Sequence, residues 1–129
     1  RHMAKNNRIF IAFAAEDSNY RDLLVGQAKN AKSTFSFVDM SVKQPWDSQW
    51  KTNCRSKIKG CDGLIAIVTS RSINADGQRW EIKCANEEGV PVIGIHAQKS
   101  VHGVVPSELT GKKVIDWTWD GIKAFLDSL

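Results

Sequence analysis

The feature that most constrains the fold of this chain is the apolar run Gly63–Val68, which contains no polar side chain. A strand with one face in water alternates apolar and polar residues, whereas a strand covered on both faces is apolar throughout. Four further runs, mostly apolar, recur along the chain at residues 8–13, 35–38, 91–95 and 114–117. The pattern predicts a parallel sheet whose two faces are both covered.

Segments with helical signals lie between these runs. Residues that commonly start a helix occur in three places: Asp17 or Ser18, Asp47 or Ser48, and Asp76 or Gly77. The third helix is expected to end at Gly89, because Pro91 follows it and a glycine before a proline is a frequent helix stop. A last helix is expected over residues 121–129. Residues 97–113 have no clear period and are expected to form a long loop with at most a short helical turn.

Five strands joined by helical crossovers predict a single flavodoxin-like α/β domain. Because such crossovers are almost always right-handed, the favoured strand order is 2-1-3-4-5, with helices on both faces. The length of 129 residues suits one domain, which we place at residues 4–129. Residues 1–3 are expected to be an expression-tag remnant and the starting methionine. No run approaches the roughly 20 apolar residues of a membrane helix and no leader peptide is evident, so a cytoplasmic protein is expected.

Charge and composition argue against several classes of function. The net charge of +4 comes from lysines and arginines scattered along the chain, so neither nucleic-acid nor membrane binding is favoured. Three cysteines, Cys54, Cys61 and Cys84, form no pair with zinc spacing and are expected to be reduced, buried thiols. His96 and His102 form no H-E-x-x-H pattern. We therefore expect no metal site and no bound cofactor.

The carboxyl ends of the strands are the expected place for a site, because ligands of open α/β sheets bind in the crevice where the strand order reverses. Three loops meet there, at residues 13–17, 39–46 and 69–74. The first lacks the glycines and hydroxyls that cradle a phosphate, and no dinucleotide-binding glycine motif or P-loop occurs. The strand 63–68 is not followed by the aspartate of a phospho-receiver site. No G-x-S-x-G elbow or Cys/His pair predicts a nucleophile.

One carboxylate remains as the best candidate for a working residue. Glu81 lies near the start of the helix that follows the strand 63–68, next to Trp80. Cleavage of a glycosidic bond passes through an oxocarbenium-like state, which a single carboxylate can stabilise. When the leaving group is already a cation, such as nicotinamide, no second acid is needed to protonate it. Cleavage of NAD+ is therefore chemically possible for this set of residues.

Two segments resemble TIR domains. Residues 9–13 (IFIAF), followed by Glu16 and Asp17, resemble the first strand and loop of that family, and residues 77–85 (GQRWEIKCA) resemble its catalytic helix. Residues 39–45 are more similar to the divergent bacterial and archaeal TIR-like family, which includes the NAD-consuming sensor of Thoeris anti-phage defence. Many TIR domains have a tryptophan four residues before the glutamate, where this chain has Gly77.

The resemblance implies that the chain hydrolyses NAD+ or converts it to a cyclic ADP-ribose isomer that serves as a second messenger. Glu81 would be the catalytic residue, which holds the ribose hydroxyls and stabilises the developing cation. Together with the positions of the loops, the resemblance implies these substrate-binding residues: Phe13, Ala14, Ala15, Asp17, Asp39, Ser41, Trp46, Ser70 and Trp80. NAD+ is then a substrate and not a cofactor. The implied partners are further copies of the chain, in a homo-oligomer or TIR–TIR assembly, and a messenger-gated effector from a neighbouring gene.

Plainer roles are open for some of the same residues. Glu81 also suits a solvated position near a helix start, and Asp17 suits a helix cap. Trp80 suits core packing, as do Trp46 and Trp50, which are one helical turn apart. Two other functions are open as well. One is a non-catalytic TIR-type interaction module that uses residues 39–46, and the other is a domain that binds a nucleotide without cleaving it.

Overall fold

Five parallel strands form the sheet of the structure, a computed structural model that describes residues 8–40, 47–98 and 102–129. The strands are β1 (Arg8–Ala12), β2 (Ser36–Val38), β3 (Gly63–Val68), β4 (Val92–His96) and β5 (Lys113–Asp116). Their order is β2-β1-β3-β4-β5 and every pairing is parallel, so the predicted topology is confirmed. The expected tag remnant at residues 1–3 lies outside the described residues.

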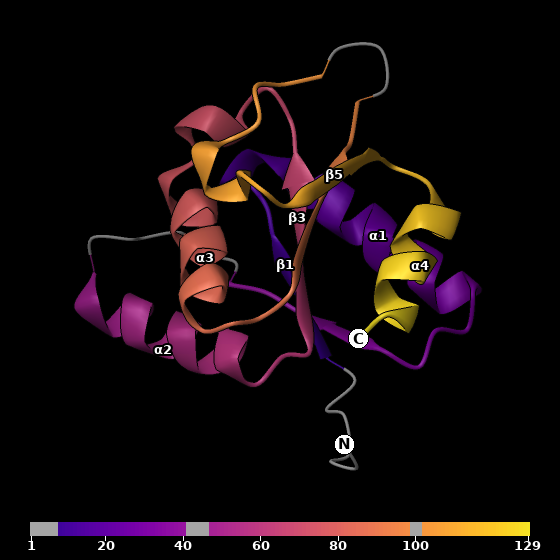
Figure 1. Ribbon diagram of the computed structural model, residues 1–129, viewed down its shortest axis with the longest axis horizontal. Helices are drawn as coiled ribbons and strands as arrows, with labels where there is room; N and C mark the ends of the chain where they lie inside the picture. Colours follow the sequence, from indigo (N-terminus) through magenta and orange to yellow (C-terminus); the bar gives the residue numbers. More distant parts are fainter. Residues whose placement is uncertain (1–7, 41–46, 99–101) are drawn as a thin grey trace.

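Helices cover both faces of this sheet (Figure 1), as predicted. They are α1 (Ser18–Asn30), α2 (Ser48–Lys59), α3 (Asp76–Glu87) and α4 (Trp119–Asp127). Because successive side chains of a strand point to opposite faces, β3 contributes to two hydrophobic clusters. Leu64 and Ala66 pack with residues of α2 and α3, whereas Ile65 packs with residues of α1 and α4. All of β3 is buried, which is the physical reason for its apolar sequence.

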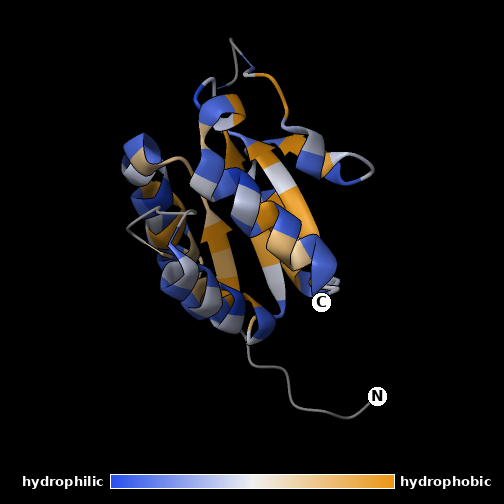
Figure 2. Ribbon diagram, turned by 90° about the vertical axis from the view of Figure 1, so that its left-hand side faces the viewer, coloured by the Kyte–Doolittle hydropathy of each residue, from blue (hydrophilic) through white to orange (hydrophobic). Residues whose placement is uncertain are grey.

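Hydropathy follows the same layers. Figure 2 shows hydrophobic strands behind helices whose outer surfaces are largely hydrophilic. Trp50, Cys54 and Ile58, at one-turn spacing on α2, are buried against the sheet, so the packing role of Trp50 is confirmed. The three cysteines are free and buried, as predicted. Among the described residues, no helix is long and apolar enough to cross a membrane.

The ends of α2 and α3 carry the signals that predicted them. The Asp47 carboxylate accepts hydrogen bonds from the backbone nitrogens of Gln49 and Trp50, at 2.8 and 3.2 Å, and so caps α2. Gly89, with φ of 71°, follows the last turn of α3. The backbone nitrogens of Gly89 and Val90 donate to Asn86 and Ala85, which is the paired arrangement of a Schellman motif.

The C-terminal part of the chain differs from its prediction by one or two residues. The strand ends at Asp116, one residue before its predicted end, although the Trp117 backbone nitrogen still donates to His96 O of β4 at 3.2 Å. The Trp117 indole nitrogen donates to Gln27 Oε1 on α1 at 2.9 Å. Helix α4 begins at Trp119, two residues earlier than expected, because the Thr118 hydroxyl caps it by accepting from Gly121 N. Within the described part of the expected loop 97–113, Ser107–Leu109 form a single 3-10 turn.

Candidate functional site

Buried polar side chains gather near the carboxyl ends of β1 and β3. Among the described residues, six polar or charged side chains are buried, and five of them belong to the loops after these strands or to the first half of α3: Asp17, Thr69, Ser72, Gln78 and Glu81. The loops 13–17 and 69–74 therefore face each other, as the strand order predicts. Polar groups are costly to bury unless they have partners, so their hydrogen bonds define what this region can do.

Asp17 joins the loop after β1 to the loop after β3. The Thr69 hydroxyl donates to Asp17 Oδ2 at 2.5 Å, and the Arg71 guanidinium donates to Oδ1 at 2.8 Å. The expectation that the Asp17 side chain caps α1 is wrong, because it makes no capping hydrogen bond although it occupies the N-cap position. Its carboxylate is fully buried and holds the two loops together. Arg71 keeps 51 % of its side chain exposed at the edge of this network.

Gln78 spans the ends of both strands from the first turn of α3. Its Nε2 donates to the backbone oxygens of Ala12, at 3.0 Å, and Ile67, at 2.7 Å. The Ser72 hydroxyl donates to the Ile67 oxygen as well, at 3.3 Å. Sequence analysis missed Gln78. The available signal was its spacing, since Gln78, Ile82 and Ala85 share the helix face that is buried.

Glu81 is fully buried, so the alternative of a solvated helix glutamate is wrong. The Cys54 thiol of α2 donates a weak hydrogen bond to Glu81 Oε2, with 3.9 Å between sulfur and oxygen. The carboxylate therefore points toward α2 from the buried side of α3. Taking a carboxylate out of water costs several kcal/mol. Titratable groups held in such surroundings are frequent at functional sites, which keeps Glu81 the leading candidate.

The remaining predicted substrate-binding residues occupy different surroundings. Phe13 and Ala14 are buried at the end of β1, whereas Ala15 and Ser70 are exposed. Asp39 is half-buried and accepts from the Arg21 guanidinium at 2.7 Å. That guanidinium lies 5.4 Å from the centre of the Phe13 ring, so Arg21 links the ends of β1 and β2, a contact that sequence analysis missed. Ser41 and Trp46 lie outside the described residues.

Trp80 packs between α2 and α3 and does not join the polar network. Its ring lies edge-on to the Trp50 ring, 5.3 Å between centroids, and the Arg55 guanidinium lies 5.5 Å from the ring centre. With residues of α2 it lines a shallow depression of about 470 Å³. Trp80 and Glu81 are adjacent in α3 but point in different directions. The Glu81 side chain lies in the interior, whereas the Trp80 ring lies between α2 and α3.

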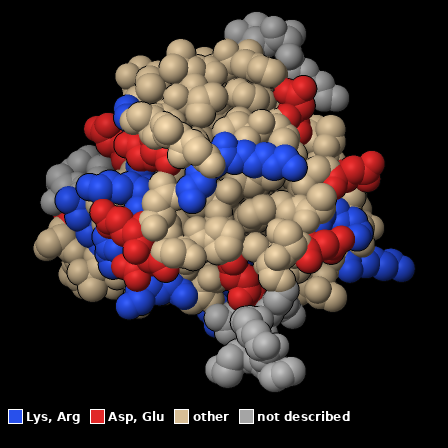
Figure 3. Space-filling model, in the orientation of Figure 1, with Lys and Arg blue, Asp and Glu red and all other residues tan. Residues whose placement is uncertain are grey.

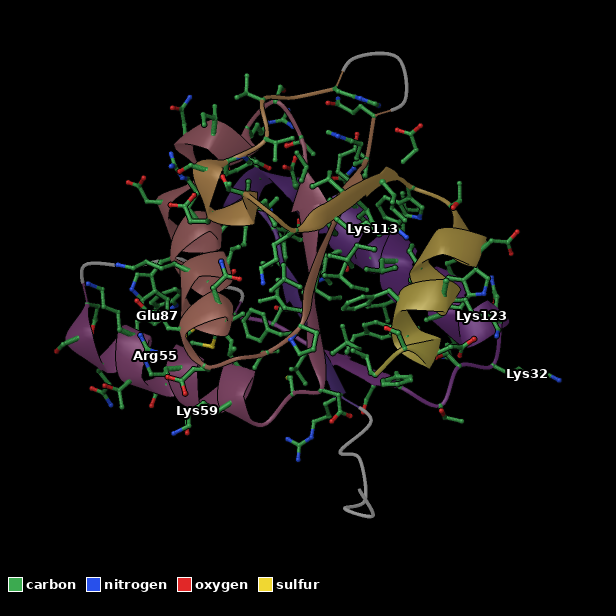
Figure 4. All side chains as sticks on the ribbon, viewed as in Figure 1. Lys32, Arg55, Lys59, Glu87, Lys113 and Lys123 are labelled. Carbon is green, nitrogen blue, oxygen red and sulfur yellow. The ribbon has the colours of Figure 1, made fainter. Side chains whose placement is uncertain are left out.

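Some of the charged side chains on the surface form ion pairs. Arg55 of α2 donates to Glu87 at 2.9 Å and to Glu88 at 2.6 Å, and Figure 4 shows Arg55 and Glu87 on neighbouring helices. The face in Figure 3 carries both signs interspersed. Ion pairs of this exposed kind contribute little to stability, and on this face no single sign of charge dominates.

A second cluster, unforeseen in the sequence, lies at the ends of β4 and β5. The rings of His96 and His102 stack with 3.9 Å between centroids, and His102 Nε2 lies 2.8 Å from Asp116 Oδ1. Burial and the neighbouring His102 lower the pKa of His96 below its ordinary value, although Asp116 opposes this shift. No group of three metal-ligating side chains exists among the described residues.

Cys61 and Cys84 do not offer a nucleophile. Burial raises the pKa of Cys84 to about 11 and that of Cys61 to about 11, so both thiols are protonated at neutral pH. Of the two fully buried carboxylates among the described residues, Asp17 is held by Thr69 and Arg71, so Glu81, beside this polar network, is the group with the most distinctive chemistry. A carboxylate in such a place can stabilise a cation or hold hydroxyl groups.

Comparison with known protein families gives a match over the part of the chain that contains this site. The family model described as "Thoeris protein ThsB, TIR-like domain" matches residues 10–102, from β1 to the loop beyond β4, and so includes α2, α3 and the polar network. A comparison with curated proteins found no match.

Proposed function

The chain belongs to the Thoeris ThsB family of TIR-like domains, and from this premise we propose that it cleaves the bond between nicotinamide and ribose in NAD+. The products are nicotinamide and either ADP-ribose or a cyclic ADP-ribose isomer. In anti-phage defence signalling, the isomer would serve as a messenger for an effector from a neighbouring gene. NAD+ is the substrate in this proposal, and no cofactor is required.

The observation that carries the proposal is the burial of the Glu81 carboxylate on α3, one turn from the network at the ends of β1 and β3. When the bond from the ribose carbon to nicotinamide breaks, positive charge develops on the ribose. A carboxylate stabilises that charge more strongly in a dry site than in water. Nicotinamide leaves as a neutral base, so the site needs no acid to protonate it. Glu81 can supply the chemistry without a second carboxylate.

Enclosure of Glu81 also sets a condition on the reaction. Its side chain has no exposed surface, so a substrate reaches it only when the surrounding groups move apart. We propose that self-assembly of the chain provides this rearrangement, and that the separated domain turns over little NAD+. Exposed apolar side chains that could serve assembly include Leu23 of α1, which is 60 % exposed, and Val104, which is 65 % exposed.

The same enclosure favours a second candidate function. In a non-catalytic interaction module, Glu81 would be a packed side chain that contacts Cys54 of α2 and takes no part in a reaction. Gly77, at the position where many TIR domains carry tryptophan, also fits that reading.

Nicotinamide release distinguishes the two functions. It should be measured with the wild-type chain, Glu81→Gln and the control Glu87→Gln, which alters a carboxylate of the same helix that is 46 % exposed. Self-association should be followed by sedimentation over the same protein concentrations. We expect Glu81→Gln to lower the rate by about 100-fold or more, the effect of losing a group that stabilises transition-state charge, and Glu87→Gln to leave it nearly unchanged. Equal release by the wild type and Glu81→Gln would remove Glu81 from the mechanism. Assembly without release by any variant would support the interaction module.

A further inference from the structure

A buried hydrogen-bond acceptor near Glu81 has no partner. In the described part of the chain, three buried side-chain atoms lack a hydrogen bond: Gln78 Oε1, His96 Nδ1 and Gln98 Oε1. Gln78 is only 1 % exposed, so water on the surface does not satisfy its oxygen. Unsatisfied buried acceptors are rare in native proteins, and each one calls for an explanation.

The orientation of the Gln78 amide is fixed by its other end. Nε2 donates to Ala12 O at 3.0 Å and to Ile67 O at 2.7 Å. If the amide were turned over, its oxygen would face two carbonyl oxygens, which have no proton to donate. The nitrogen therefore stays on the strand ends, and Oε1 is held away from them with its lone pairs free for a donor.

Gln78 and Glu81 form a pair on one helix. They are three residues apart in α3, and side chains at this spacing are neighbours, with about 5–6 Å between Cβ atoms. Both are buried, and one is a rigidly held amide oxygen while the other is a carboxylate. Two buried acceptors at neighbouring positions of one helix suit a ligand that carries two separate donor groups.

The nicotinamide half of NAD+ carries two such groups: the ribose hydroxyls and the amino group of the carboxamide. The proposed mechanism assigns the hydroxyls to Glu81, which leaves the carboxamide for Gln78. Resting on that proposed function, we infer that Gln78 Oε1 accepts a hydrogen bond from the carboxamide N–H of bound nicotinamide. Gln78 is then the residue that selects a base with a carboxamide.

Equilibrium binding tests this inference without relying on turnover. NAD+ and 3-acetylpyridine adenine dinucleotide, in which a methyl group replaces the amino group of the carboxamide, should be titrated by calorimetry into the assembled Glu81→Gln protein, which keeps the dinucleotides intact. We expect NAD+ to bind tenfold or more tightly, because the analogue leaves the buried acceptor unpaired. Equal affinities, or no binding of either dinucleotide, would overturn the inference.

Variants at position 78 give a second readout. Gln78→Lys keeps donors for the two backbone oxygens and removes the acceptor. In the Glu81→Gln background it should abolish the preference, whereas Gln49→Lys, on the exposed surface of α2, should preserve it. A preference that persists in a folded Gln78→Lys protein would overturn the inference. If this variant does not fold, the affinities of the two dinucleotides for the protein that retains Gln78 test the inference by themselves.

The outcomes also separate the inference from the proposed cleavage. Preferential binding of NAD+ without nicotinamide release by the wild-type chain would refute the cleavage and uphold the role of Gln78. Nicotinamide release together with equal affinities for the two dinucleotides would uphold the cleavage and refute the role of Gln78.

Discussion

Replacement of Thr69 by valine tests whether the Asp17 network holds the strand ends together. Valine has nearly the shape of threonine, so the change removes the hydroxyl and leaves no cavity. The lost hydroxyl donates to a buried carboxylate at 2.5 Å and accepts from the Arg71 backbone nitrogen at 3.1 Å. A hydrogen bond to a charged group is worth about 1.5–3 kcal/mol and a neutral one about 0.5–1.5 kcal/mol. We expect the free energy of unfolding to fall by about 2–4.5 kcal/mol, the sum of these two contributions.

The assay is urea unfolding followed by tryptophan fluorescence, with linear extrapolation to water. Thr52→Val is the matched control, because the Thr52 hydroxyl donates to Ser48 O at 3.0 Å on the exposed surface of α2. An exposed substitution of this kind changes the free energy of unfolding by less than about 0.5 kcal/mol. If Thr69→Val and Thr52→Val lowered stability equally, the claim that the Asp17 network contributes to stability would be refuted.

Three further predictions concern other parts of the chain. Cys61 and Cys84, buried and each with a pKa raised to about 11, should resist iodoacetamide at pH 8 until urea unfolds the chain; rapid labelling of the folded protein in mass spectra would contradict this. The pKa of His96 is lowered from 6.5, so the folded state binds fewer protons than the unfolded state, and stability should fall as the pH drops below 6.5. In urea titrations at several pH values, the stability of His96→Gln should depend less on pH than that of the wild type. The same dependence in both proteins would argue against a role of His96. Gly103→Ala should cost about 1–3 kcal/mol in thermal unfolding, because its Cβ would lie 2.2 Å from Thr69 O. A Cβ added at Gly26 would have no atom within 4 Å, so Gly26→Ala should stabilise α1 by up to about 1 kcal/mol. Equal effects of the two substitutions would contradict the close approach of Gly103 to Thr69.

The sheet could be predicted because its determinants are local. A strand such as β3, buried on both faces, must be apolar throughout, and this marks it in the sequence. Gly89 and Pro91 end α3 by conformational rules that act within a few residues. The start of α4 was misplaced because Thr118 caps it between two tryptophans, where the apolar pattern resembles the end of a strand.

The site was harder to predict because its contacts are distant in the sequence. Asp17 has the local pattern of a helix cap, yet its partners Thr69 and Arg71 lie 52 and 54 residues away. Gln78 binds a backbone oxygen 66 residues away, and no local pattern encodes that contact. The burial of Glu81 depends on how α3 packs against α2, which periodicity indicates only coarsely.

The most direct test of the role of Glu81 is the rate at which nicotinamide appears from NAD+, followed by proton NMR, with the assembled wild-type chain and the assembled Glu81→Gln chain in parallel. We expect steady appearance of nicotinamide with the wild type. With Glu81→Gln, we expect the rate to be lower by about 100-fold or more. The same rate from both proteins, at equal assembly and equal stability, would contradict a catalytic role for the Glu81 carboxylate.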